Sequence, residues 1–185
     1  MEIARSRDED VGRLLGLVRE AFGGPEEAEL VRDLLQDPSA KPCLSLLATE
    51  EGEAVGHILF TRVEISPGPD SLPPSAPAPL AAILAPLAVL PSAQGKGVGG
   101  GLIREGLRQL ARSGVELVFV LGHPGYYPRY GFRSAGAMGL EAPFPIPEEQ
   151  AEAWMVAPLH PGILGEVKGR VICADALSRP ELWRE

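Results

Sequence analysis

The chain has 185 residues, of which 45% are hydrophobic and 23% are charged, and these values are typical of one globular domain of ordinary size. Its formal net charge of −8 argues against nucleic acid as a partner, because a phosphate backbone is bound by a basic surface. No apolar run reaches the ~20 residues of a membrane span, and the N-terminal residues do not resemble a signal peptide, so we expect a cytoplasmic protein without membrane contact.

Hydrophobic spacing and breaker residues predict helices and strands in alternation. In chain order, the expected elements are a strand at residues 1–5, a helix from Ser6 to Phe22, a helix that begins at Pro25 and ends at Asp37-Pro38, strands at 43–49 and 54–65, a strand at 80–90, a helix at 100–113 and a strand at 115–121. Ser6 and Glu9 have the spacing of a capping box at the start of the first helix. The last of these strands, VELVFVL, is almost entirely apolar, which indicates a central position in a sheet.

Two segments lack a clear period. Residues 66–79, SPGPDSLPPSAPAP, contain too many prolines to pair as a strand and too few apolar residues to pack, which predicts a mobile loop. Residues 136–185 form a C-terminal extension broken by proline and glycine, with strand candidates at 154–159 and 167–173.

The stretch at residues 84–101 combines an apolar strand, a glycine-rich turn and the start of a helix. Glycines let the backbone pass close to a ligand, and the free N–H groups of a helix's first turn attract an anion together with the helix dipole. A phosphorylated ligand is therefore expected here. The residues that would hold it are Gln94, Gly95, Lys96, Gly97, Val98, Gly99 and Gly100.

Three kinds of phosphate-binding site use such a turn, and their sequence patterns differ. The P-loop pattern G-x-x-x-x-G-K-[ST] is absent, which argues against hydrolysis of nucleoside triphosphates. Gly95, Gly97 and Gly100 satisfy the dinucleotide pattern G-x-G-x-x-G, so a dinucleotide-binding oxidoreductase is one alternative. That pattern belongs at the first strand of its domain, however, whereas here residues 1–83 come before the turn.

The third pattern is [RQ]-x-x-G-x-[GA] after a strand that ends hydrophobic-x-Val-x-Pro, and residues 87–99 satisfy it. This phrase resembles the acetyl-CoA-binding motif of the GNAT superfamily of N-acyltransferases. A second phrase, Y-x-x-x-G-F at residues 127–132, is similar to the one that closes the GNAT core. The longer pattern G-H-P-x-Y-Y-P-R-[FY]-G-F is further similar to that of a bacterial subgroup of predicted N-acetyltransferases.

The resemblance implies a fold and a set of cofactor contacts. The fold is a single α/β (α+β) domain over residues 1–185, with its core at 1–135 and a mixed, mostly antiparallel central sheet that has helices on both faces. In this fold the strand before the glycine turn carries a bulge and splays away from the next strand, which agrees with Pro86 inside it. Backbone contacts to acetyl-CoA are implied at Leu87, Ala88 and Val89.

Transfer of an acetyl group to an amine needs a donor for the developing oxyanion and a proton donor for the departing thiolate. A strand N–H freed by the splay, between Leu87 and Val89, would serve the oxyanion. The resemblance assigns the general acid to Tyr127, and we expect Tyr126 and Tyr130 to pack instead.

The base that accepts the amine's proton is harder to locate. An amine like that of lysine has a pKa of ~10.4 and must lose a proton before it attacks. Many GNAT relatives have a Glu on the strand before the glycine turn, but residues 80–93 contain no carboxylate here. The candidates are His57, Glu64 and His123. No metal is expected, because the histidines lack ligand spacing, and Cys43 and Cys173 are expected to be free thiols.

These features predict an N-acetyltransferase that uses acetyl-CoA and a primary amine. The acceptor is expected to be a small-molecule or peptide amine whose pocket comes from the 22–30 region, the 66–79 loop and the C-terminal extension, and a homodimer is left open. The missing carboxylate on the strand before the glycine turn favours an alternative, a non-catalytic acyl-CoA-binding module.

Overall fold

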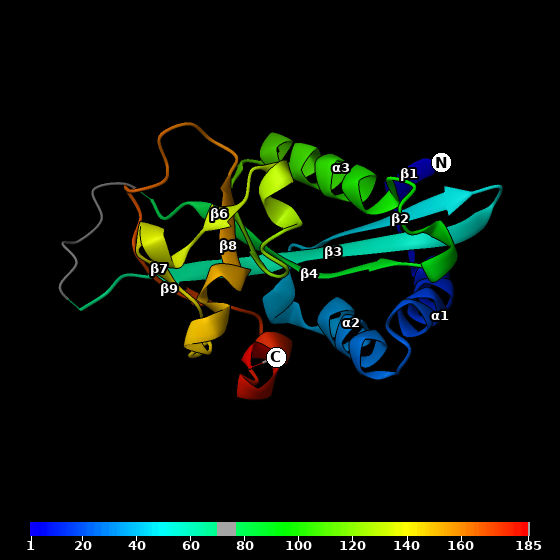
Figure 1. Cartoon of the computed structure of the whole chain (residues 1–185), viewed down its shortest axis with the longest axis horizontal. Coiled ribbons are helices and arrows are strands. Elements are labelled where there is room, and N and C mark those ends of the chain that lie inside the picture. The colour runs from blue at the N-terminus through cyan, green and yellow to red at the C-terminus, as the bar shows by residue number, and fades with distance from the viewer. Residues whose placement is uncertain (70–76, 185) are drawn as a thin grey trace.

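A computed structural model describes residues 1–69 and 77–184 and shows a mixed sheet with helices on both of its faces (Figure 1). The strands are β1 (Glu2–Arg5), β2 (Leu44–Glu50), β3 (Glu53–Ser66), β4 (Leu80–Val89), β5 (Val115–Leu121), β6 (Arg133–Ser134), β7 (Leu140–Glu141), β8 (Trp154–Pro158) and β9 (Gly169–Ile172). The helices are α1 (Val11–Phe22), α2 (Glu26–Gln36) and α3 (Val98–Arg112). In Figure 1, α3 covers one face of the sheet, while α1 and α2 lie together against the other.

Across the sheet the strands follow the order β1-β2-β3-β4-β5-β8-β6. Neighbours in this order are antiparallel, except that β4 and β5 are parallel, so the expected mixed and mostly antiparallel sheet is confirmed. Strand β8 comes from the C-terminal extension and pairs with β5. This pairing places β5 inside the sheet and accounts for its apolar sequence.

Strands β4 and β5 separate part-way along their length, as expected. Their pairing runs from Leu80 to Leu84 on β4 and goes no further. At this point the register between β3 and β4 also shifts, so that Ala85 and Pro86 together lie opposite Leu59. The two-against-one arrangement is the bulge that Pro86 predicted, and the second half of β4 has β3 as a partner but not β5.

The start of α1 differs from the prediction. A 3₁₀ turn at Asp8–Asp10 precedes the helix, and the backbone N–H of Arg7 donates to a side-chain oxygen of Asp10 at 2.8 Å. The predicted capping box of Ser6 and Glu9 is therefore wrong. The hydroxyl of Ser6 instead donates to Ser45 Oγ on β2 at 2.6 Å, a bond across the sheet that local spacing could not reveal.

The predicted mobile loop at residues 66–79 includes residues 70–76, which lie outside the described part of the chain. Ser66 is the last residue of β3 and pairs with Arg170 of β9. Residues 67–69 and 77–79 belong to no helix or strand. Among residues 1–69 and 77–184, no helix combines the length and the apolarity that crossing a bilayer requires.

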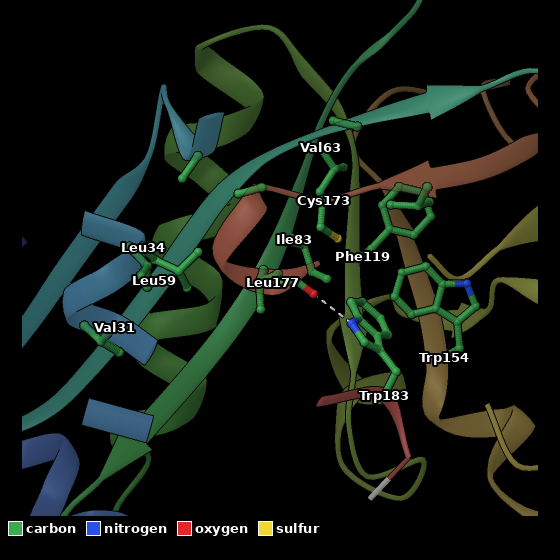
Figure 2. Packing of buried hydrophobic residues seen from close by; sticks show 14 of the residues in the cluster. Val31, Leu34, Leu59, Val63, Ile83, Phe119, Trp154, Cys173, Leu177 and Trp183 are labelled. Carbon is green, nitrogen blue, oxygen red and sulfur yellow. Dashed lines mark hydrogen bonds between the residues drawn. The ribbon is translucent and has the colours of Figure 1, made fainter. Parts of the chain in front are cut away.

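The C-terminal extension packs into the core on the side of the sheet that α1 and α2 cover (Figure 2). Trp154 stacks on Phe119 with 5.2 Å between ring centroids, and Trp183 lies edge-on to Trp154 at 5.6 Å. The indole N–H of Trp183 donates to the carbonyl of Leu177 at 3.0 Å. Cys173 lies in the same cluster as a free thiol, and burial raises its pKa to about 12.

Candidate active site

The cradle, residues 89–100, is built where β4 ends and α3 begins. Gly97 is the N-cap residue of α3 and has a φ of +84°, a conformation that residues with a side chain rarely adopt. Its carbonyl accepts the N–H of Gly101 at 2.9 Å, so the N–H groups of residues 98–100 have no partner within the helix. The Gln94 side chain donates back to the end of β4 at 3.3 Å. The free N–H groups and the helix dipole together favour an anion at this end of α3.

A cavity of about 560 Å³, here called the cradle cavity, lies over these residues. The predicted contact residues that line it are Leu87, Val89, Gln94, Gly95, Gly97, Val98, Gly99 and Gly100. Two other predicted contacts, Ala88 and Lys96, do not line it. The Ala88 side chain is buried in the cluster on the opposite face of the sheet, and Lys96 is exposed.

Two tyrosines expected only to pack also line the cradle cavity. The hydroxyls of Tyr126 and Tyr130 lie 3.5 Å apart, and a Cβ at Gly99 would come within 2.7 Å of the Tyr126 hydroxyl. The guanidinium carbon of Arg129 lies 5.1 Å from the Tyr126 ring centroid, and that of Arg104 lies 5.8 Å from the Tyr130 ring. Two guanidinium groups therefore lie against these tyrosines, although the whole chain carries a net charge of −8. In the sequence, only their four-residue spacing indicates that these tyrosines point the same way.

The splay exposes backbone donors of β4. Leu90 N donates to Val55 O at 3.0 Å, so the alternation of an antiparallel pair directs the N–H of Ala88 toward β3 as well. The same alternation directs the N–H groups of Leu87 and Val89 away from β3, into the gap that β5 leaves. A free oxyanion donor was expected between Leu87 and Val89, and the geometry selects these two positions.

A second cavity, of about 550 Å³ and here called the α2-side cavity, lies on the other face of the sheet. Its lining comes from the end of α1, from α2, from the bulged part of β4, from the segment after β5 and from the C-terminal extension. The 22–30 region and the extension, both expected near an acceptor, thus contribute to one cavity. Leu87 lines both cavities, so both reach β4 just beyond the point where it leaves β5.

Tyr127 lines the α2-side cavity with 9% of its surface exposed. Its ring packs against the backbone at Gly122 and lies edge-on to Phe132 at 5.6 Å between centroids. Burial raises the pKa of Tyr127 to about 12, so the phenol keeps its proton at neutral pH. The side chain is therefore held in place as a hydrogen-bond donor.

His57 lies in neither of these two cavities. Its side chain is fully buried on the face of β3 that α1 covers, beside the apolar residues of that cluster. Its Nε2 lies 2.8 Å from Ser45 Oγ, and its Nδ1 has no partner among the described residues. Burial lowers the pKa of His57 to about 4, so the ring is neutral at pH 7.

The other two base candidates are far apart on the molecule. Glu64 lies near the end of β3 that pairs with β9, outside both cavities, and forms an ion pair with Arg62 at 2.6 Å. His123 lines the α2-side cavity, and its Nδ1 accepts the N–H of Gly125 at 3.0 Å. Because Nδ1 is the acceptor of this bond, Nε2 is the hydrogen-bond donor of the His123 ring. The structure thus brings His123 and Tyr127 into one cavity and leaves Glu64 elsewhere.

Glu27 is a carboxylate of the α2-side cavity that the sequence analysis missed. It lies in the first turn of α2, is partly buried, and takes part in none of the ion pairs within residues 1–69 and 77–184. Glu26 and Glu29 stand in the same turn, and nothing in the sequence separates the three. Only the packing of α2 on the sheet directs Glu27 to the cavity. Within the same described ranges, no three His, Cys, Asp or Glu side chains gather as a metal site would require.

Comparison with protein families connects this geometry to known proteins. The sequence model of the acetyltransferase (GNAT) family matches residues 12–132. The chain belongs to the GNAT family. It is an acyltransferase, as its two motifs indicated, and this assignment replaces the dinucleotide-binding alternative.

Relatives and solved structures extend the likeness beyond the matched core. The uncharacterized N-acetyltransferase YjhQ of Escherichia coli K12 is 53% identical over 156 residues, which span 84% of this GNAT protein and 82% of YjhQ. The crystal structure of YhbS from E. coli in complex with CoA has a TM-score of 0.82 at 28% identity, with 96% and 92% of the two chains covered. A GNAT acetyltransferase from Brucella melitensis in complex with acetyl-CoA has a TM-score of 0.71 at 29% identity, with 95% and 96% covered.

Proposed function

We propose that this GNAT protein transfers the acetyl group of acetyl-CoA to a primary amine that enters through the α2-side cavity. One observation carries the proposal: Leu87 lines both cavities, at the point where the splay frees its backbone N–H. A cofactor held in the cradle and an amine held on the other face would therefore meet at the same residue of β4.

The cradle suits the phosphates of acetyl-CoA. The free N–H groups of residues 98–100 offer the donors, and the absence of a side chain at Gly97 leaves the approach open. Arg129 adds a cation within the lining, and Lys96, which precedes Gly97 in the sequence, is exposed. The complexes of YhbS with CoA and of the Brucella protein with acetyl-CoA support the same choice of cosubstrate.

When bound, acetyl-CoA supplies an acetyl thioester, whose carbonyl carbon is attacked by the amine and whose sulfur leaves as a thiolate. The N–H groups of Leu87 and Val89 face the gap and would donate to the carbonyl oxygen as it gains negative charge. The Tyr127 hydroxyl would donate to the sulfur. Because thiols have a pKa of ~8.5, well below that of Tyr127, this contribution is mainly a hydrogen bond to a thiolate that already leaves readily.

The α2-side cavity also limits the choice of proton acceptor. An attacking amine must lose a proton near Leu87, and His57 and Glu64 lie outside the cavity that reaches it. We propose Glu27 as the carboxylate that faces the incoming amine. His123 is the second group of the cavity, although in its neutral form the hydrogen bond from Gly125 leaves Nε2 as a donor.

The test combines binding with turnover. Acetyl-CoA should raise the melting temperature of the purified protein, whereas NAD and ATP should not. Release of free thiol should then be followed with a panel of amines, and steady release with any of them supports the proposal. Binding of acetyl-CoA with no thiol release from any amine would instead indicate a non-catalytic acyl-CoA-binding module.

A further inference from the structure

We propose that the acceptor is a single primary amine carried on an apolar body, aromatic or branched, with its ammonium group bound by Glu27. This inference rests on the proposed function and specifies the class of acceptor. It follows from three properties of the α2-side cavity: the chemistry of its walls, their rigidity and the number of charged groups.

The walls are mainly hydrophobic. Phe22 and Leu30 line the cavity from the helices, Ile83 from β4, and Leu182 and Trp183 from the C-terminal extension. Phe22 is 44% exposed although it is a large aromatic residue, so part of this apolar wall is accessible. A ligand with an apolar body would remove this surface from water, which is favourable.

The C-terminal wall is closely packed, and Figure 2 shows Trp183 hydrogen-bonded to Leu177 beside Trp154. Trp183 is 2% exposed, donates to Leu177 at 3.0 Å, and packs edge-on against Trp154. Trp154 is in turn anchored by its indole N–H, which donates to the carbonyl of Leu140 at 3.0 Å. A wall fixed in this way selects its ligand by shape, because it does not have to be ordered when the ligand binds.

Glu27 is the only Asp, Glu, Lys or Arg among the described residues that line the cavity. One carboxylate can pair with one ammonium group. A polyamine or an aminoglycoside would bring further ammonium groups against apolar walls, where an unpaired charge is strongly unfavourable. A peptide would bring backbone amides that need partners, and few polar side chains are present. A volume of about 550 Å³ is within the usual range for small-molecule sites, which agrees with a compact acceptor.

The first experiment compares acceptors of different class on the wild-type protein. Phenethylamine, spermidine, kanamycin and a short peptide with a free N-terminus are supplied with acetyl-CoA, and thiol release is measured. We expect kcat/KM for phenethylamine to exceed that for each of the others by about tenfold or more, since leaving one buried polar group without a partner costs about that much. Faster or equal turnover of spermidine, kanamycin or the peptide would overturn the inference and leave the proposed function intact. If acetyl-CoA binds and no acceptor releases thiol, the proposed function fails and the inference fails with it.

The second experiment tests Glu27 through binding, independently of turnover. In the presence of CoA, Glu27→Gln should weaken the binding of phenethylamine by about tenfold, the value of a hydrogen bond to a charged group, and leave the neutral analogue 2-phenylethanol unchanged. Glu29→Gln, which makes the same change outside this cavity, should affect neither. An equal loss for the alcohol, or no loss for the amine, would show that Glu27 does not bind the ammonium group.

A third variant should alter the class of acceptor. Leu182→Glu adds a second carboxylate to the partly buried C-terminal wall, and it should raise kcat/KM for spermidine relative to phenethylamine. An unchanged ratio, in a variant that binds acetyl-CoA normally, would contradict selection by the number of carboxylates.

Discussion

The two cavities have nearly the same volume, about 560 and 550 Å³, but they are made in different ways. The cradle cavity comes mostly from one continuous stretch, residues 87–100, with a turn of tyrosines beside it. It presents backbone N–H groups, a helix end and the guanidinium group of Arg129. The α2-side cavity is assembled from segments scattered along the whole chain, and it presents apolar side chains with one carboxylate.

This difference indicates how each side would recognise its ligand. Backbone N–H groups bind an anion by its charge and its position. Most side chains around the cradle can therefore vary, while the glycine positions cannot. The side chains of an apolar cavity determine the shape of ligand that it accepts, so each substitution in its lining changes which ligands bind. Related enzymes can therefore share one cradle and differ in their acceptors.

Tyr127 lines the α2-side cavity but is proposed to act on the sulfur of a cofactor held in the cradle, so its replacement tests whether the two sides work together. Tyr127→Phe removes one hydroxyl and keeps the packed ring. We expect turnover to fall by roughly 10- to 100-fold, the value of a hydrogen bond to a charged group, with acetyl-CoA affinity and acceptor KM nearly unchanged. Tyr130→Phe, on the cradle side, is the control and should cost far less. Wild-type turnover in Tyr127→Phe would remove the role proposed for this residue.

Trp183→Ala should damage the α2-side cavity and spare the cradle. Truncation of a buried aromatic residue should lower the free energy of unfolding by about 3–5 kcal/mol, measured by chemical denaturation. The folded variant should have a raised acceptor KM and an unchanged affinity for acetyl-CoA. Loss of acetyl-CoA binding with unchanged acceptor kinetics would mean that the two cavities are not separate in the way described.

Gly97→Asp should damage the cradle and spare the α2-side cavity. It places a carboxylate at the anion-binding end of α3, so the stabilisation by acetyl-CoA, about 2.7 kcal/mol at 100 times the dissociation constant, should be lost. Gly52→Asp is the matched control, because Gly52 has the same φ of +84° and open space at its Cβ but lies in the hairpin between β2 and β3. If acetyl-CoA raises the melting temperature of Gly97→Asp as much as that of Gly52→Asp, the cradle does not hold the phosphates.

His57 belongs to neither cavity, so its effect should be on stability alone. The unfolded chain binds a proton at His57 near pH 6.5, whereas burial delays protonation in the folded state to about pH 4. Stability should therefore fall as the pH drops through this window, and His57 should account for about 2 kcal/mol between pH 7 and pH 5. Denaturation curves at the two pH values should show a smaller loss for His57→Gln. An equal loss in both proteins would show that His57 does not carry this dependence, and acetyl-CoA affinity should be the same in both.

The cradle and the bulge could be predicted from the sequence because their determinants are local, whereas the splay was implied by the resemblance to the GNAT fold. Pro86 indicated the bulge, and the spacing around Gly97 indicated the cradle, since each needs only neighbouring residues. The α2-side cavity could not be predicted in the same way. Glu27 and Trp183 are more than a hundred residues apart, and only the packing of α2 and the C-terminal extension on one face brings them together. His57 was proposed as a base because its residue type fits, but strand alternation directs it into the core.

The position of Leu87 between two cavities on opposite faces of the sheet also bears on the order in which the substrates bind. An amine that enters from the α2 side reaches β4 without passing through the cradle, so neither substrate needs to leave before the other arrives. Under the proposed function both can be present together, in either order of arrival, and the acetyl group would pass directly from sulfur to nitrogen across the gap. Initial-rate lines for one substrate at several fixed levels of the other should then intersect, whereas parallel lines would require an acetylated enzyme between two separate half-reactions.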